Sequence, residues 1–256
     1  MKTKRKITFT DWWFEHDSLE SLMKAKGMVD DRTLVLSSYW LPIDHGAESM
    51  REAAKSAKAN GMEIAAFDLR HELGVNSPDT LPLKLAIVAE LGVRGVIFSL
   101  PKDYQLKSDS PEYAGLVEMI KADLERAYAD CTRAGMEMWV EFEMRYSERS
   151  DAVMALVMPL VKAKGIKLCV EYQIDGYDWE KSPGYQMLQE NCERLAYLEI
   201  PYEEITELKP LLLKLPEDSI LAILPSSFKN GKVSAALEAL SKVFPEINAK
   251  KGKGEK

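Results

Sequence analysis

The sequence predicts a (β/α)8 TIM barrel, in which eight parallel strands alternate with eight helices. Short apolar segments typical of strands alternate with longer segments typical of helices along the whole chain. The chain has 256 residues, a usual length for one such barrel. We therefore expect a single barrel domain over residues 1–248, followed by a disordered tail rich in lysine and glycine over 249–256. An open doubly wound sheet is the alternative fold.

The first part of the chain supplies five expected strands and the four helices between them. The strands span 7–13, 33–40, 62–70, 93–100 and 138–145, and the helices span 18–29, 47–60, 80–91 and 111–134. Gly61, Gly92 and Gly135 each follow a helical segment, where glycine adopts the left-handed conformation that ends a helix. Ser110 and Pro111 favour a helix start, because serine caps the first turn and proline fits inside it.

The second part repeats the same unit. Helices are expected over 149–164, 183–193, 203–215 and 232–244, and strands over 166–175, 195–200 and 219–225. Gly165 ends the first of these helices, and Pro159 predicts a kink within it. The regular alternation favours the closed barrel over the open sheet.

Composition restricts the partners and the compartment. The net charge of −7 disfavours nucleic acid, whose phosphates need a basic surface. Cys131, Cys169 and Cys192 are odd in number and widely spaced, which argues against disulfides and a zinc site. We see neither a long apolar run for a membrane nor a secretory signal. The expectation is a cytoplasmic protein with a small-molecule or carbohydrate substrate and no membrane or nucleic-acid partner, its oligomeric state left open.

The segment 138–145 carries the strongest functional signal. Its apolar residues alternate with Glu141, Glu143 and Arg145, which a barrel strand places inside the ring. The same alternation turns Ala65 and Ala196 toward the helices and Leu195 inward. It assigns to the interior the acids Asp68, Glu141, Glu143, Glu171, Asp175 and Glu199, and the bases Arg70 and Arg145.

These acids outnumber the bases by six to two. A network of ion pairs would need balanced charges, because an unpaired buried carboxylate is costly. The surplus indicates raised pKa values, a bound cation, a cationic ligand or solvent in an open mouth. Ion pairs plus solvent are the purely structural alternative.

The main hypothesis is a glycoside hydrolase that uses two carboxyl groups and no cofactor. One carboxyl stays protonated as the acid while another acts as nucleophile or base. Glu199 is expected to be the nucleophile or base, and Glu143 or Glu171 is expected to be the acid. Substrate-binding residues are expected at the carboxyl ends of the strands: Asp11, Trp13, Trp40, Asp68, Arg70, His71, Arg145, Gln173, Asp175 and Trp179.

Two resemblances accompany this hypothesis. Glu199 at the end of the seventh strand is similar in place to the nucleophile of the large barrel glycosidase clan. That clan's acid follows an asparagine on the fourth strand, which Ser99 and its neighbours do not match. Acids on the fifth to seventh strands also resemble the metal ligands of xylose-isomerase-like barrels. Those barrels have a further ligand on the eighth strand, where residues 221–227 offer none.

Two other functions stay open. One is a divalent-metal-dependent sugar isomerase, epimerase or lyase, with Mg²⁺ or Mn²⁺ held by the oxygen ligands Glu141, Glu171 and Glu199. The other is a non-catalytic barrel that binds a cationic small molecule such as a polyamine. The loops after the last two strands lack phosphate-binding glycines, and no interior lysine is placed for a Schiff base.

Overall fold

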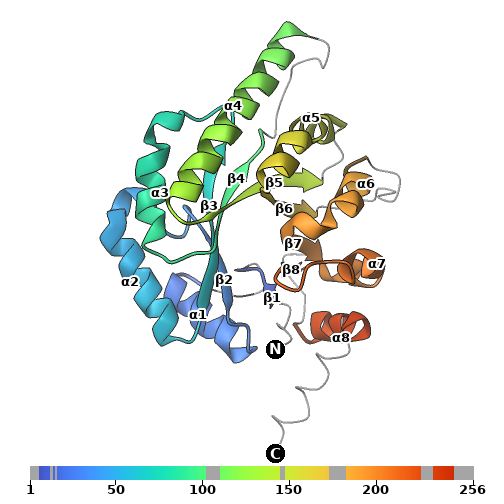
Figure 1. Cartoon of the computed structure of the whole chain (residues 1–256). Helices are drawn as coiled ribbons and strands as arrows, with labels where there is room; N and C mark the ends of the chain where they lie inside the picture. Colours follow the sequence, from blue (N-terminus) through green and yellow to red (C-terminus); the bar gives the residue numbers. More distant parts are fainter. Residues whose placement is uncertain are drawn as a thin grey trace, which may run out of the picture.

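The chain forms a nearly closed barrel of eight parallel strands surrounded by eight α-helices (Figure 1). The computed structural model describes residues 6–11, 14, 16–101, 110–144, 148–172, 183–225 and 233–244. The prediction of a (β/α)8 barrel is confirmed. The expected tail over 249–256 lies outside the described residues.

The elements follow one another in the expected order. The strands are β1 (Lys6–Phe9), β2 (Thr33–Ser37), β3 (Glu63–Glu72), β4 (Gly95–Ser99), β5 (Glu137–Met144), β6 (Lys167–Tyr172), β7 (Leu195–Pro201) and β8 (Ile220–Leu224). The helices are α1 (Leu19–Met28), α2 (Gly46–Ala59), α3 (Leu81–Ala89), α4 (Pro111–Arg133), α5 (Glu148–Lys164), α6 (Pro183–Glu190), α7 (Lys209–Leu212) and α8 (Val233–Val243).

Local sequence signals account for most helix ends. The four glycines at 61, 92, 135 and 165 follow α2 to α5 and have φ between 66° and 74°. The long helix expected over 203–215 is instead split into a 3-10 turn, Tyr202–Ile205, and the short α7. Pro210 is the reason, because proline fits only the first turn of a helix.

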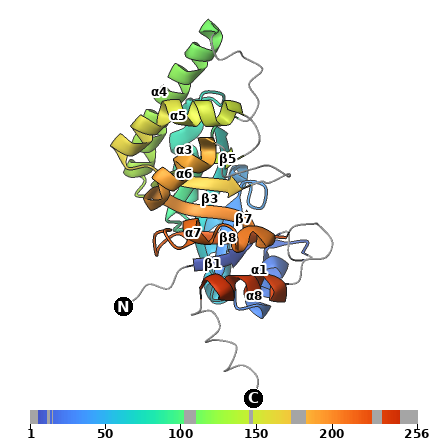
Figure 2. The ribbon, with the colours of Figure 1, turned by 90° about the vertical axis from the view of Figure 1, so that its right-hand side faces the viewer.

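Helix α4 is the longest and extends beyond the other helices (Figure 2). Ser110 caps its start and accepts a 3.1 Å hydrogen bond from the amide of Tyr113, as the sequence predicts. Among the described residues, no helix is both long and apolar enough to span a membrane.

A break in the strand ladder separates β1 from β2. Within the described strands, β1 pairs only with β8 and β2 only with β3. A buried ion pair lies here, with Lys26 Nζ 2.6 Å from Asp31 Oδ2. Lys26 also donates to Phe9 O and to Thr8 Oγ1, and Asp31 accepts from the amides of Phe9 and Thr33. These five residues, the β1–β2 seam, give both strand edges the hydrogen bonds that a ladder would supply.

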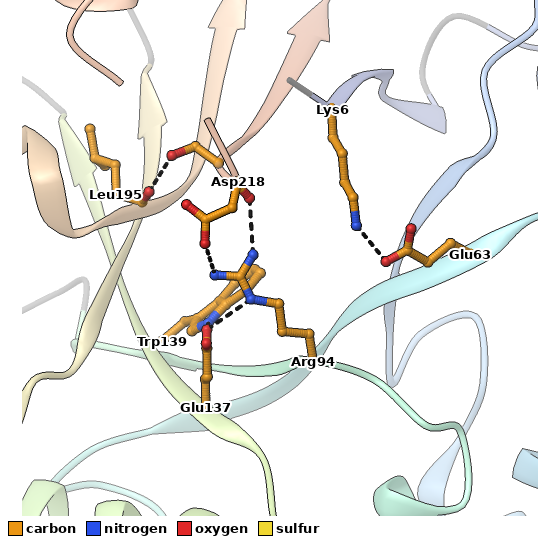
Figure 3. Close-up of polar contacts among 8 residues, drawn as sticks. Lys6, Glu63, Arg94, Glu137, Trp139, Leu195 and Asp218 are labelled. Carbon is orange, nitrogen blue, oxygen red and sulfur yellow. Dashed lines mark hydrogen bonds and ion pairs between the residues drawn. The ribbon is translucent and has the colours of Figure 1, made fainter. Parts of the chain in front are cut away.

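The amino-terminal end of the barrel is closed by side chains (Figure 3). Arg94 forms ion pairs with Glu137 at 3.1 Å and Asp218 at 2.6 Å, so it joins the start of β5 to the turn before β8. Trp139 is fully buried, and its Nε1 donates a 2.9 Å hydrogen bond to Glu137. Its ring covers Gly95 so closely that a Cβ atom there would overlap the indole. The lumen is therefore a packed core at this end, as is usual in such barrels.

Two strands depart from the predicted alternation. Ala65 and Ala196, expected to face the helices, lie in the inner apolar cluster with Trp139. Leu195, expected inside, packs in the outer core. The cause is a register shift on each strand, between β2 and β3 beside Ala65 and between β6 and β7 beside Ala196. An extra residue at a bulge shifts the inward and outward alternation by one position. The prediction is therefore reversed for the residues that precede the bulge and correct for those that follow it.

Candidate active site

A cavity of about 740 Å³ lies at the carboxyl ends of the strands. Its wall combines residues from all eight strands with residues of α1 and of the loops that follow β1 and β2. The predicted site residues that line it are Asp11, Trp40, Asp68, Arg70, Glu141, Glu171 and Glu199. The sequence pattern thus brings together side chains from six strands or strand ends.

Three glutamates occupy the same level on neighbouring strands. The Cα of Glu171 pairs with those of Glu143 on β5 and Glu199 on β7, and Glu199 pairs with Ala222 on β8. Adjacent strands are about 4.8 Å apart, so the charges of Glu171 and Glu199 influence each other strongly. The side chain of Glu143 lies outside the described part of the structure.

The carboxyl of Glu199 has a strongly raised pKa. Burial and the neighbouring charge of Glu171 raise the pKa of its carboxyl to about 8, although a hydrogen bond from Tyr197 acts in the opposite direction. The Tyr197 hydroxyl lies 2.5 Å from Glu199 Oε2 and is its donor. Burial also raises the pKa of Tyr197 well above its usual value, so the hydroxyl keeps its proton. Glu199 is therefore a neutral acid near pH 7.

Glu141 lies one layer deeper in the barrel. Its Cα pairs with those of Ser99 and Cys169, and the Ser99 hydroxyl donates a 2.9 Å hydrogen bond to its Oε2. Burial and the charges of nearby acids, first Glu141, raise the pKa of the Cys169 thiol well above its usual value. Cys169 therefore stays protonated and does not supply a thiolate.

The described acids do not fit a bound divalent metal. No three His, Cys, Asp or Glu side chains in the described part of the chain lie close enough to hold one ion. The candidate ligands Glu141, Glu171 and Glu199 fail because Glu141 lies a layer below and is bound by Ser99, while Glu199 is bound by Tyr197. Ala222, level with Glu199 on β8, offers no ligand atom. The expected Mg²⁺ or Mn²⁺ site is thus not formed by these three residues.

Aromatic residues from the loops after β1 and β2 surround the mouth. Trp40 Nε1 donates a 3.0 Å hydrogen bond to Asp11 Oδ2, and the His16 ring lies 4.6 Å from the Trp40 ring. Tyr39 meets Trp40 edge to face at 5.6 Å, and the Arg70 guanidinium lies 5.5 Å from the Tyr39 ring. We call His16, Tyr39, Trp40 and Arg70 the aromatic rim. It joins the ends of the first three strands above the cavity.

Arg70 lies beside Asp68 and not beside the glutamates. Its Nε is 4.0 Å from Asp68 Oδ2, and its amide donates a 2.7 Å hydrogen bond to Asp68 Oδ1. The backbone of Arg70 has φ of 50°, an unusual value for a residue with a side chain. This conformation accompanies a register shift between β3 and β4, and the side chain is left 61% exposed.

His71 does not line this cavity, although the sequence predicts it as a substrate-binding residue. It is 1% exposed, and its ring lies edge to face with Phe98 at 5.7 Å. Neither ring nitrogen has a hydrogen-bond partner among the described residues. Burial lowers the pKa of this histidine. The turn of the chain at Arg70 places the next side chain against the outer core, which its position after a strand does not reveal.

Trp13, Arg145, Gln173, Asp175 and Trp179 lie outside the described residues.

Sequence reasoning did not single out Lys26, which also lines the cavity. In the segment Lys24-Ala25-Lys26 this residue resembles the solvent-exposed face of a helix. Three acceptors, on Asp31, Thr8 and Phe9, take up its three ammonium protons. Lys26 is therefore part of the β1–β2 seam and has no proton left for a ligand.

Comparisons with known proteins identify the fold and leave the family open. No family model and no curated protein sequence matches the chain. Solved structures do: the 3-keto-D-glucoside 4-epimerase YcjR from E. coli is 13% identical with a TM-score of 0.67, over 94% of this chain and 99% of that one. An L-ribulose 3-epimerase is 15% identical with a TM-score of 0.60, over 94% and 86% of the two chains. The IolI protein with a bound zinc atom is 10% identical with a TM-score of 0.66, over 96% and 98%.

These neighbours correct the main functional hypothesis. The interpretation as a glycoside hydrolase is wrong, because the similar structures are of sugar epimerases and support the isomerase or epimerase alternative. The pattern behind it, acids at the ends of neighbouring strands, suits any reaction that needs one neutral and one ionised carboxyl.

Proposed function

We propose that this protein is a sugar isomerase or epimerase that moves a proton at a carbon next to a carbonyl group. The observation that carries this proposal is the neutral Glu199, held by Tyr197 beside Glu171 inside the cavity. Two of the structural neighbours are sugar epimerases, which supports it. A small polyhydroxy compound is the substrate class.

The proposed chemistry needs a base and an acid at the same time. Glu171 removes a proton from the carbon, and the electron pair of that C–H bond moves toward the carbonyl oxygen. Glu199 donates its proton or a hydrogen bond to that oxygen, as buried neutral carboxyl groups do in other proton-transfer enzymes. A proton donated to the opposite face by a second acid gives an epimer, and return of the proton from Glu171 to the neighbouring carbon gives an isomer.

Other residues of the cavity are proposed to bind the substrate. Asp11 and Asp68 accept hydrogen bonds from hydroxyl groups, and Trp40 offers a ring face to the sugar. Glu143, in register with Glu171, remains a predicted catalytic acid. No step uses a metal, since the described side chains do not provide its ligand set.

The test is solvent exchange in D₂O. The protein is incubated with a panel of ketoses, aldoses and 3-keto glycosides, and NMR detects deuterium at the carbon next to the carbonyl. Glu171→Gln should abolish the exchange while substrate binding persists, and Glu199→Gln should slow it by about 10²–10⁴-fold, as loss of a general acid does. Glu190→Gln, an exposed change on α6, is the control. Exchange should also survive a chelator. Undiminished exchange in Glu171→Gln would refute the assignment.

A further inference from the structure

We infer that the cavity binds an uncharged glycoside, with its reacting sugar ring among the glutamates and a second ring against the aromatic rim. The choice of the ring that reacts rests on the proposed function. The binding of the second ring is argued from the cavity itself.

The size of the cavity is the first argument. Ligand cavities of about 300–1,000 Å³ usually enclose drug-sized molecules. A volume of about 740 Å³ is in the upper half of that range, so one sugar ring leaves part of it empty. The lining is also divided, with Glu171, Glu199 and Tyr197 toward the barrel interior and the aromatic rim at the mouth.

The rim is the second argument. Tyr39 is 69% exposed, the highest value among the tyrosine, tryptophan and phenylalanine residues that the structure describes, and it lies between Trp40 and Arg70. Trp40 is in turn fixed by Asp11 and by the His16 ring. Aromatic side chains that contact one another beside a cavity suit ligand binding, because a flat ring can stack on them with little loss of side-chain freedom.

Charge is the third argument, and in the described lining it disfavours an anionic substrate. The described lining contains two residues with long cationic side chains, Lys26 and Arg70. Each of them already has a carboxylate partner. Lys26 is 2.6 Å from Asp31, and Arg70 is beside Asp68. A phosphate or carboxylate group would therefore meet the acids without a free cation to offset the repulsion.

The same lining gives little reason for a cationic substrate. Asp11 accepts a hydrogen bond from Trp40, Glu141 accepts one from Ser99, and Glu199 is neutral. Glu171 is the base of the proposed reaction and needs a C–H group next to it. An uncharged sugar supplies hydroxyl donors to these acceptors without neutralising the base.

Calorimetric titration with matched ligands tests this inference. The probes are the methyl and phenyl β-glycosides of glucose, galactose and mannose, with the 6-phosphate and 2-amino forms of the phenyl glycoside that binds best. The phenyl glycoside should bind about two- to tenfold more tightly than the methyl glycoside, as one aromatic contact provides. The 6-phosphate form should bind at least about tenfold more weakly, since one like-charge contact costs over a kilocalorie.

Variants locate the second ring. Tyr39→Ala should remove the preference for phenyl over methyl glycosides, and Tyr39→Phe should keep it. Leu213→Ala, an exposed change on the chain after α7, is the control. Two outcomes with the wild-type protein would overturn the inference: equal binding of methyl and phenyl glycosides, or no binding of any glycoside. So would an unchanged preference in Tyr39→Ala, and so would tighter binding of the 6-phosphate or 2-amino form. Binding without deuterium exchange would refute only the proposed reaction.

Discussion

The hydroxyl of Tyr197 donates a 2.5 Å hydrogen bond to Oε2 of Glu199, two residues further along β7. Tyr197 and Glu199 both point into the lumen, and the tyrosine lies one layer closer to the barrel floor. The bond occupies one lone pair of Oε2 and leaves Oε1 of Glu199 available to a ligand in the cavity.

Glu199 should make the protein less stable as the pH rises. The folded state keeps the proton up to about pH 8, whereas the unfolded state loses it near 4.5. Between these values the unfolding free energy falls with pH, by at most about 1.4 kcal/mol per unit from this group. Glu199→Gln should remove this contribution. Urea unfolding of both proteins from pH 5.5 to 8 measures it, with Glu190→Gln as control, and identical slopes in wild type and Glu199→Gln would contradict it.

His71 should have the opposite effect. Burial lowers its pKa below 6.5, with Asp123 acting against that shift, so the unfolded state takes up the proton first on acidification. The contribution of His71 to the free energy of unfolding is therefore fully present above about pH 6.5 and is lost as the pH falls below that value. His71→Phe should flatten the decrease in melting temperature between pH 7.5 and 5.5. His45→Phe, which changes an exposed histidine, should retain it. An equally steep decrease in His71→Phe would show that other groups cause it.

The β1–β2 seam should depend on its ion pair. Lys26→Met leaves Asp31 buried without its partner, which costs about 3–5 kcal/mol in comparable sites. Adding Asp31→Asn should restore part of the loss. Lys121→Met removes an exposed pair with Glu118 and should cost at most about 0.5 kcal/mol. Urea unfolding compares the variants, and equal effects of Lys26→Met and Lys121→Met would disprove the assignment.

Gly95 and Trp139 should behave as a coupled pair. Gly95→Ala forces a methyl group into the indole ring and should cost about 1–3 kcal/mol or more. Trp139→Leu makes room for it but creates a cavity of its own. The double variant should therefore lose less stability than the two single variants added together. Additive losses in thermal unfolding would mean that the ring and the methyl group do not meet.

Much of the fold could be predicted because its signals are local. Glycine after a helix and apolar alternation within a strand act over a few residues, and they placed α2 to α5 and the strands between them. The bulges at Ala65 and Ala196 could not be predicted, since alanine suits either face of a strand and the register shift depends on the neighbouring strand.

The site residues could be predicted where the apolar and polar alternation of a strand alone decides which side chains face the barrel interior. Asp68, Glu171 and Glu199 were assigned to the interior and line the cavity. Lys26 was missed because a lysine on a helix normally faces solvent, and only the break between β1 and β2 brings it inside. The choice of reaction was wrong because paired carboxylates serve hydrolysis and proton transfer equally well, and the residue pattern does not separate them.

The order of the strands has a consequence for biosynthesis. Of the eight described strands of the barrel, β1 is synthesised first, and its only ladder partner among them is β8, which is synthesised last. The edge of β1 that pairs with β8 thus has no ladder partner until Ile220–Leu224 has been translated. The edge of β1 that faces β8 is therefore exposed until the other strands of the barrel have been synthesised, and a chaperone that shields this edge would act during that interval.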